Sequence, residues 1–577
     1  MAAAVAAFVL VAFVLGYRFY ARFVGRKIFE DEEEIVTPAV EFEDGKDFVP
    51  TNRHILFGHH FTSIAGAAPI IGPCVAAYWG WLPALIWVVL GTIFMGAVHD
   101  FGALVASIRE RGRSIADIAG NVLNPRVRVM FLCFVLVLSW LVLAVFAMAI
   151  AGLFVAVPTS VLPINIEIVV AVVIGWLIYK KRVAALLPSL AALVILYTCV
   201  WIGASHPLAL QDLGLDRGQA KTTWILALFA YSSIASLLPV WLLLQPRDYI
   251  NSHQLFVGLA LLYAGLFVAH PDFDAEMIRT HADGAPSLFP LLFVTIACGA
   301  ISGFHGLVSS GTTSKQIASL RDARMIGYGA MLGEGTLALA STMAAVAGIG
   351  LVTTCTLPGQ GTVADLSWSV YYDTWQNAGA NKAAAFVLGG GAFLEQIGLS
   401  AAVAKTLMAV LVISFAATTL DTATRIERFI VAEIGDALRI RILANRFVAT
   451  LIAVLPAIAL ALWTVENPAK PGQTTEAAWL LWPIFGASNQ MLAGLTLMVL
   501  ALYFSQRRRP VLPLVIPMLF VMVVTLTSLV IQTRGFWLAN NWLLFSVGLL
   551  LTAMIVWMIF EGLGMLAHIR RERSSHP

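Results

Sequence analysis

The sequence predicts an all-α polytopic membrane protein of about fifteen transmembrane helices, built as a five-plus-five inverted repeat with two broken helices plus extra helices. Hydrophobic residues make up 59% of the 577 residues, charged residues only 12%, and the mean hydropathy is +0.85. A soluble domain carries about 25% charged residues, so a chain this apolar cannot cover a water-exposed surface. Its apolar runs of ~18 or more residues suit spanning helices, and they lack the short alternating segments of a β-barrel.

The apolar runs give the predicted spans in order. They are residues 2–24, 54–79, 82–108, 128–157, 164–179, 183–203, 222–244, 255–270, 288–311, 325–351, 401–420, 444–464, 478–505, 511–532 and 537–566. An odd number of spans places the two termini on opposite sides of the membrane.

The N-terminal segment, residues 1–24, is predicted to be an anchor helix. Its positive charges lie between residues 18 and 27, after the apolar run rather than before it. That order favours an uncleaved anchor with the N-terminus outside. The acidic, polar stretch that follows makes residues 25–53 a predicted cytoplasmic linker.

The distribution of positive charge supports this topology. With the N-terminus outside, the predicted cytoplasmic segments contain 29 of the 36 Lys and Arg residues, and the outer segments contain seven. Cytoplasmic loops of membrane proteins carry an excess of Lys and Arg. The C-terminus is therefore predicted to be cytoplasmic. In the long outer loop 352–400, the Gly-broken stretch 384–400 is predicted to be a re-entrant or surface helix.

Two predicted helices carry signals for a break near the bilayer midplane. The first, 54–79, has a run of small residues followed by Pro69 and Pro73, which remove helical N–H donors. The second, 222–244, contains several serines and Pro239 in its middle. Interrupted helices of this kind hold the substrate in many transporters, although Gly, Ser and Pro also permit close helix packing alone.

The charge topology gives the two broken helices opposite orientations. Residues 54–203 are therefore predicted to form a first inverted repeat and residues 222–420 a second, with 444–566 as additional transmembrane helices. The pattern resembles the five-plus-five fold of sodium-coupled amino-acid and sugar symporters.

Ionisable side chains inside predicted spans are unfavourable in hydrocarbon and indicate function. Counting ~1.5 Å per residue places most of them about 7–15 Å from the cytoplasmic boundary, where they can form one cluster. Such a cluster can carry a proton, because His titrates near neutrality. The alternative is that each forms a separate helix-packing hydrogen bond. The candidates are His59, His60, His99, Asp100, His305 and Glu334.

Hydroxyl groups gather at the inner end of the predicted helix 288–311. In the symporter fold, hydroxyls of the eighth helix face carbonyls of the first broken helix and hold sodium. Ser309, Ser310 and Thr313 are the candidates for that role. If sodium is not the coupling ion, a protonated side chain takes the same place. Membrane Ser and Thr also commonly bond to the preceding helical turn.

Several other functions lack their motifs. The chain has no GxxxxGK[ST] loop, no HExxH motif and no paired catalytic carboxylates, so we predict a transporter rather than an enzyme, without cofactor or bound metal. The basic clusters are explained by topology and predict no nucleic-acid partner. The membrane histidines leave one alternative of another class, a haem- or metal-binding redox protein. The oligomeric state has no signal in the sequence.

Seven sequence blocks resemble the signature blocks of the carbon starvation protein A family, itself similar to the amino acid–polyamine–organocation superfamily. Between residues 53 and 494 they read, in family order, RHILFGHHFTSIAGAAPIIGP, GAVHDF, RGRSIADIA, LFPLLFVTIACGAISGFHGLVSSGTTSKQI, RMIGYGAMLGE, DTATRIERF and LWPIFGASNQMLAG. The resemblance implies nutrient uptake across the bacterial inner membrane, of pyruvate with protons or of peptides.

The residues themselves suit a small carboxylate, because helix N-termini favour anions. Pyruvate or a similar acid with proton symport is the main prediction, and peptide transport is the alternative. The predicted substrate-binding residues are His59, His60, Ser63, Ala65, Gly66, Ala67, Ser232, Ser233 and Ser236.

Overall fold

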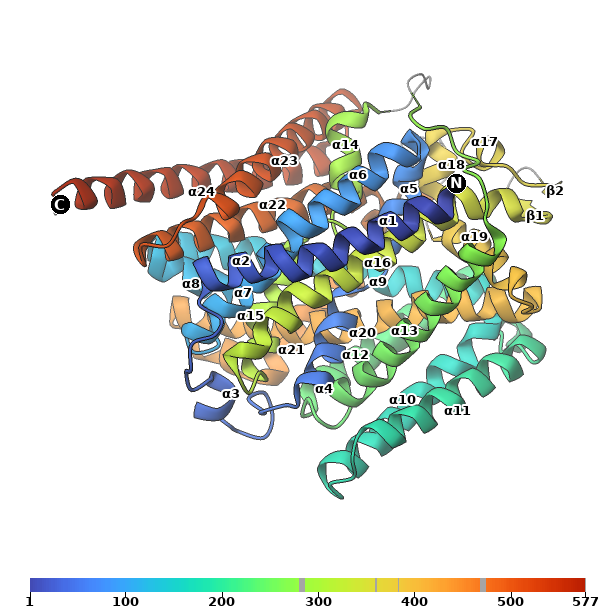
Figure 1. The fold of residues 1–577 in the computed structure, drawn as a ribbon, viewed down its shortest axis with the longest axis horizontal. Helices are drawn as coiled ribbons and strands as arrows, with labels where there is room; N and C mark the ends of the chain where they lie inside the picture. Colours follow the sequence, from blue (N-terminus) through green and yellow to red (C-terminus); the bar gives the residue numbers. More distant parts are fainter. Residues whose placement is uncertain (280–285, 358–360, 382, 467–473, 576–577) are drawn as a thin grey trace.

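Helices make up nearly all of the secondary structure (Figure 1). The computed structural model describes residues 1–279, 286–357, 361–381, 383–466 and 474–575. The helices are α1 (Ala2–Leu15), α2 (Arg22–Val24), α3 (Pro38–Glu41), α4 (Arg53–Ile64), α5 (Ala68–Ala76), α6 (Trp81–Gly91), α7 (Ala97–Arg109), α8 (Ile115–Val122), α9 (Pro125–Ala156), α10 (Val161–Tyr179), α11 (Leu186–Ser205), α12 (Arg217–Leu237), α13 (Leu244–Ala269), α14 (Leu288–Thr295), α15 (Gly303–Gly311), α16 (Ala330–Met343), α17 (Trp368–Tyr371), α18 (Trp375–Asn381), α19 (Ala384–Gln396), α20 (Ala401–Leu438), α21 (Arg446–Leu462), α22 (Ala477–Gln506), α23 (Leu512–Leu538) and α24 (Trp542–Ser575).

Two small antiparallel hairpins complete the described structure. Strand β1 (Thr354–Leu357) pairs with β2 (Gly361–Ala364), and β3 (Thr464–Glu466) pairs with β4 (Thr474–Glu476). Both lie between helices, so neither contributes a layer to the fold.

The predicted spans agree with helices throughout the described chain. In those residues, eleven helices are long and apolar enough to cross a membrane, and the bent pair Arg53–Ile64 with Ala68–Trp79 makes a twelfth. Helices also occupy the other three predicted positions, but α12 ends at Leu237, α21 has 17 residues, and 288–311 is divided in two. The number fifteen therefore remains a prediction.

Several helices are longer than their apolar cores. The N-terminal anchor continues to Phe29 rather than ending at residue 24. Helix α13 begins at Leu244 rather than 255, and α20 continues to Leu438 rather than 420. In each case the additional residues are polar or charged, so the apolar run is shorter than the helix that contains it.

The first break is where the sequence predicted it. Helices α4 and α5 meet at a bend of 45° with residues 65–67 between them. Asn52 caps the start of α4 by accepting a hydrogen bond from the His54 N–H. Pro69 stands in the first turn of α5, where a missing N–H removes no helical hydrogen bond.

The break predicted in the middle of 222–244 is absent; the helix is interrupted only near the end of that range, where residues 238–243 separate α12 from α13. Helix α12 runs without interruption through Ser232, Ser233 and Ser236 to Leu237, and Pro239 follows its end. The serine hydroxyls donate to carbonyls of their own helix, so they are satisfied without unwinding it. The second break lies instead at residues 296–302, between α14 and α15.

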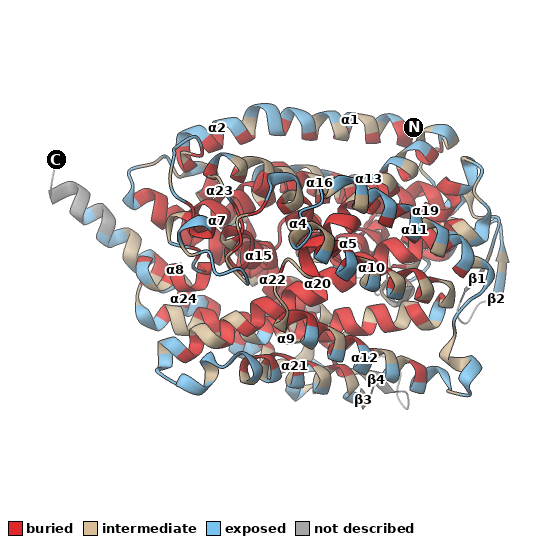
Figure 2. Ribbon diagram, turned by 90° about the horizontal axis from the view of Figure 1, so that it is seen from below, coloured by how far each residue is buried: buried red, intermediate tan, exposed pale blue. Residues whose placement is uncertain are grey.

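Helices α10 and α11 form a hairpin that packs against α13 at the edge of the molecule (Figure 1). Figure 2 shows burial concentrated in the middle of the bundle and α1 lying along its rim. Helices α21 and α22 were predicted to be additional, but α22 packs against α9, α7 and α15 in the buried interior. Of the predicted extra helices after residue 444, α23 and α24 are the peripheral pair.

The two breaks are packed closely against each other through Gly72. A Cβ atom built on this residue of α5 would lie 2.4 Å from the carbonyl oxygen of Thr295, at the end of α14. Backbone must therefore move to admit even one methyl group. We predict that Gly72→Ala destabilises the protein by about 1–3 kcal/mol, measured by thermal unfolding in detergent.

Gly535→Ala is the matched control, because a Cβ there meets nothing within 4 Å. We expect it to remain within about 0.5 kcal/mol of the parent protein. Equal unfolding temperatures for the two variants would contradict the close packing of α5 on the second break.

Candidate functional site

Two cavities lie beside the two breaks. The large cavity, about 680 Å³, reaches Ala67 at the first break and runs between α9, α19 and α20. The small cavity, about 260 Å³, is lined by Ala68 of α5 and by Ala297 and Cys298 of the second break. Trp479 lines both cavities. A small ligand can therefore reach the backbone at the breaks. It could not reach the backbone of a continuous helix packed in the interior.

The start of α5 opens toward these cavities. Ala67 is its N-cap residue, and no side chain caps the helix. Pro69 has no N–H, and the N–H groups of Ile70 and Ile71 both donate to the Ala67 carbonyl, which leaves the Ala68 N–H at the positive end of the helix dipole. The corresponding start of α15 is different, because Asn489 of α22 accepts a hydrogen bond from the Phe304 N–H at 2.9 Å. An anion at the breaks therefore fits best at α5.

Four predicted ionisable residues meet in the interior, and we call them the His305 cluster: His99, Asp100, His305 and Glu334. They come from α7, α15 and α16, and each is at most 1% exposed. His305 Nδ1 lies 3.0 Å from Asp100 Oδ2, and His305 Nε2 lies 3.2 Å from Glu334 Oε2. His99 Nδ1 lies 2.7 Å from the other oxygen of Asp100.

The geometry of this cluster suits a proton. An imidazole can donate from both ring nitrogens only when it is protonated, and both nitrogens of His305 face carboxylates. The contact between His305 Nε2 and Glu334 is within ion-pair distance but lacks hydrogen-bond geometry, so in the described residues His305 Nε2, both Glu334 oxygens and His99 Nε2 have no hydrogen-bond partner. The cluster therefore has unused hydrogen-bonding capacity and can hold different numbers of protons.

A second buried group of charges surrounds Arg247 of α13. We call it the Arg247 network: Glu167, Tyr231, Arg247 and Asp421. The Arg247 Nε donates to Glu167 at 3.1 Å, and its Nη1 donates to the Tyr231 hydroxyl at 2.5 Å. Arg247 is also paired with Asp421, which accepts a hydrogen bond from Tyr231 at 2.8 Å. Helices α10, α12, α13 and α20 are held together by these contacts.

Consecutive histidines of α4 contact different partners. His59 is paired with Asp248, the neighbour of Arg247 in α13, and so adjoins the Arg247 network. His60 Nδ1 lies 2.9 Å from the Thr313 hydroxyl, which follows α15. In the described residues, His60 Nε2 has no partner. A rotation of α4, the half-helix that ends at the first break, would therefore change both sets of contacts.

The other predicted residues divide into two groups. Ser63 lies at the break, 3.4 Å from Asp248 Oδ2 and 3.2 Å from the Thr422 hydroxyl. Ala65, Gly66 and Ala67 form the unwound turn itself, and all are buried. Ser232, Ser233 and Ser236 donate hydrogen bonds to carbonyls of their own helix and line neither cavity beside the breaks.

Only one of the three hydroxyls that were predicted to face α4 forms a hydrogen bond with that helix. Of the three, Thr313 reaches His60. Ser310 accepts from the Ile115 N–H and donates to the Gly306 carbonyl, whereas Ser309 has no partner in the described chain. The hydroxyl that donates to a carbonyl of α4 belongs to α20, where Thr419 bonds to the Ser63 carbonyl at 3.2 Å.

Four ionisable residues of the site were missed: Glu167, Arg247, Asp248 and Asp421. The last three lie just beyond the ends of the predicted apolar runs, so they were read as loop residues. Glu167 lies within the predicted span 164–179 and was overlooked. The sequence signal that could have identified Arg247 and Asp248 is the polar stretch QPRD at 245–248, which directly follows a Pro-containing apolar segment.

Bent helices that enclose two cavities, with ionisable side chains buried beside them, define a polytopic secondary transporter rather than an enzyme. The chain belongs to the family described as "Carbon starvation protein CstA", whose sequence model matches residues 1–528. The chain is accordingly a membrane protein.

Named relatives fall into two groups. The chain is 31% identical over 556 residues to the peptide transporter CstA of Campylobacter jejuni, covering 89% of this chain and 78% of the relative. It is 31% identical over 564 residues to the peptide transporter CstA of Escherichia coli, covering 89% and 79%. It is 37% identical over 350 residues to the pyruvate/proton symporter BtsT of Escherichia coli, covering 58% and 47%.

Solved structures give a weaker similarity. A manganese transporter of Eremococcus coleocola matches with a TM-score of 0.47 and 13% identity, covering 92% of this chain and 99% of that one.

Proposed function

We propose that this protein imports a small carboxylate such as pyruvate across the bacterial inner membrane, coupled to protons by alternating access. The observation that carries the proposal is the His305 cluster, in which two imidazoles and two carboxylates are buried together beside the broken helices. Ionisable groups in a membrane interior mark ion pathways, and His and carboxylate chains serve as proton relays in transporters. The proposal requires no cofactor besides the coupling ion.

A proton is favoured over sodium by the partners of the hydroxyl groups. Sodium needs several oxygen atoms directed at one point. At the first break, the Thr419 hydroxyl donates to a backbone carbonyl, and Ser63 and Thr422 bond to each other. The His305 cluster offers titratable groups with unused capacity instead.

A small carboxylate is favoured by the uncapped N-terminus of α5. Ala67 at this N-terminus lines the large cavity and Ala68 lines the small one, so a negative charge in either is stabilised by the helix dipole and can accept from the Ala68 N–H. Both His59 and His60 stand on the preceding half-helix, within two turns of the break. Replacing the carboxylate of the substrate by an amide should therefore weaken binding.

Peptides are the second candidate because of the large cavity. Its volume of about 680 Å³ exceeds what a three-carbon acid requires, and it is lined by Lys221, Lys405 and Glu395. Charges of both signs suit a zwitterion. Competition by dipeptides for the same uptake distinguishes this candidate from the first.

We further infer that the inverted repeats are residues 53–269 and 288–506, with the α10–α11 hairpin inserted in the first. Corresponding elements pack in the same way: α5 on α16 and α15 on α7, α4 on α13 and α14 on α22. Helices α9 and α20, third in each repeat, pack on each other. The charge distribution supports an N-terminus outside and a cytoplasmic C-terminus.

In this mechanism α4 transmits the state of the buried charges to the breaks. Protonation of the His305 cluster changes the charge that acts on the contact between His60 and Thr313, while His59 remains paired with Asp248. The half-helix then moves relative to α13, and the cavity beside Ala67 opens or closes. Substrate and proton cross together because both bias the same element.

Uptake by proteoliposomes containing the full chain tests the proposal. An inward gradient of one pH unit is worth about 1.4 kcal/mol and supports roughly tenfold accumulation of labelled pyruvate at one proton per substrate. We expect accumulation to collapse with an uncoupler and to be unaffected by a sodium gradient. Accumulation that follows sodium alone would overturn proton coupling, and uptake of dipeptides without pyruvate would overturn the substrate.

A further inference from the structure

A third cavity lies away from the breaks, where the segment before α4 meets the ends of α12 and α20 and the start of α21. Its volume is about 290 Å³. We call it the basic cavity, because Lys46, Arg425, Arg428 and Arg446 line it together with one carboxylate, Asp47. Four cations against one anion leave three positive charges in excess.

The carboxylate is already shared within the basic cavity. The Arg425 Nη1 donates to Asp47 Oδ1 at 2.8 Å, and the Arg428 Nη2 lies 3.5 Å from the same oxygen. In the described chain, neither Lys46 nor Arg446 has a carboxylate within ion-pair distance. Two positive side chains therefore line this cavity without an anionic partner.

Both central arginines also keep an unused donor. Arg425 is 1% exposed and Arg428 is 7% exposed. Their Nε atoms are buried and have no hydrogen-bond partner in the residues that the structure describes. A buried guanidinium donor without an acceptor is destabilising, so an acceptor supplied by a ligand would be stabilised here.

The cavity is preorganised by its own backbone. Asp44 Oδ1 accepts hydrogen bonds from the N–H groups of Lys46, Asp47 and Phe48 at 2.8–2.9 Å, which fixes the turn that carries Lys46. The Trp241 indole donates to the Gly45 carbonyl at 3.1 Å and ties this turn to the segment after α12. The turn that carries Lys46 and Asp47 is thus held in place before any ligand arrives.

We infer that the basic cavity binds a small oxyanion, of which a phosphate group is the best match. Guanidinium groups bind phosphate and carboxylate with paired, charge-assisted hydrogen bonds. The phosphate comes either from a soluble anion or from the headgroup of an anionic lipid. In both cases it links α20, α21 and the segment after α12, and so stabilises one arrangement of these helices. This site is separate from the breaks and does not depend on which substrate is transported.

Thermal unfolding of the purified full chain tests the inference. Inorganic phosphate is titrated against chloride at equal ionic strength, and separately the protein is placed in nanodiscs of zwitterionic lipid with or without phosphatidylglycerol. We expect a saturable rise in unfolding temperature with one of the two probes. A response to phosphate identifies a soluble anion, and a response to phosphatidylglycerol alone identifies a lipid headgroup.

Arg446→Gln removes an exposed cation of the basic cavity, so the variant should fold. We expect it to weaken the response roughly tenfold or more in ligand concentration, because a charge-assisted hydrogen bond is lost. Arg441→Gln, an exposed arginine outside the cavity, should respond like the parent. No response of the parent to either probe, or equal responses of the two variants, would overturn the inference.

Discussion

Replacing Glu334 by Gln is expected to abolish proton-driven accumulation while leaving exchange of substrate across the membrane. The amide keeps the shape of the side chain but cannot bind and release a proton. Glu334 Oε2 lies 3.2 Å from His305 Nε2 in the buried His305 cluster. Accumulation driven by one pH unit should therefore fall from roughly tenfold to equilibration, about a tenfold loss. Labelled pyruvate uptake and counterflow in proteoliposomes measure the two activities.

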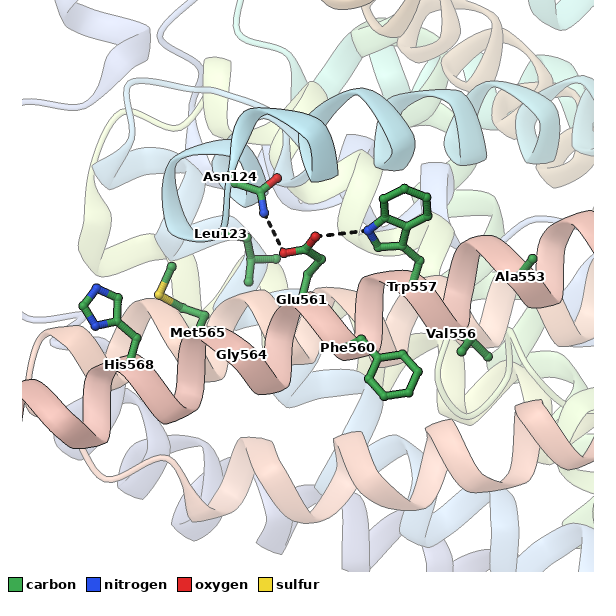
Figure 3. A pocket seen from close by; sticks show the side chains of 10 residues that line it. All are labelled: Leu123, Asn124, Ala553, Val556, Trp557, Phe560, Glu561, Gly564, Met565 and His568. Carbon is green, nitrogen blue, oxygen red and sulfur yellow. Dashed lines mark hydrogen bonds between the residues drawn. The ribbon is translucent and has the colours of Figure 1, made fainter.

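Glu561→Gln is the matched control for this variant. Glu561 of α24 accepts hydrogen bonds from Asn124 at 2.9 Å and from Trp557 at 3.1 Å (Figure 3). It lines a peripheral cavity to which no residue of the His305 cluster contributes. It should accumulate pyruvate like the parent protein. Normal accumulation by Glu334→Gln would remove Glu334 from the coupling mechanism, and loss of exchange as well would indicate a structural role instead.

Arg247→Met is expected to destabilise the folded protein by about 3–5 kcal/mol, the effect of leaving buried charges without their partner. Arg247 is 1% exposed and contacts both Glu167 and Asp421. Its removal places two carboxylates close together in the interior without a cation. The unfolding temperature in detergent and the yield of monodisperse protein report the change.

The double variant Arg247→Met/Asp421→Asn separates charge from packing. Neutralising Asp421 removes one unpaired carboxylate, so the double variant should recover part of the stability that the single variant loses. Arg441→Met, at an exposed arginine, should unfold like the parent. A double variant less stable than Arg247→Met alone would show that the Arg247 network is held by packing rather than by charge.

The first break could be predicted because its cause is local. Pro69 and Pro73 remove backbone donors within one short stretch, and the structure bends there. The second break has no proline, and residues 296–302, two of which are isoleucines, lie inside a longer apolar run. Interruption there depends on neighbours such as Asn489, which accepts from the Phe304 N–H. A contact from a distant helix leaves no local signal.

The His305 cluster could be predicted because depth follows from helix rise, and residues at one depth can meet. Its partners within the bundle could not be predicted in the same way. Arg247 lies in the polar first turns of α13 and Asp421 begins the polar second half of α20, and a search for apolar runs excludes both. They are buried because α10, α12, α13 and α20 surround them, which is a property of the assembled bundle.

The repeat boundaries that we propose differ from the predicted ones at the α10–α11 hairpin. The α10–α11 hairpin is as apolar as any span, but it packs outside, on α13. The predicted boundaries count it within the first repeat, whereas the proposed boundaries treat it as an insertion, which moves every later assignment by two helices. The sodium-facing role was thereby assigned to Ser309 and Ser310 of α15, whereas the hydroxyl of Thr419 on α20 donates to a backbone carbonyl of the first broken helix.

Proton movement driven by substrate tests the central claim most directly. Full-length protein is reconstituted into liposomes that contain a pH-sensitive dye, with equal pH on both sides and no sodium. Pyruvate added outside should acidify the interior as labelled pyruvate enters, and Glu334→Gln should admit pyruvate without the added acidification. Entry of pyruvate into parent proteoliposomes with no greater acidification than in the variant would contradict proton coupling through the His305 cluster.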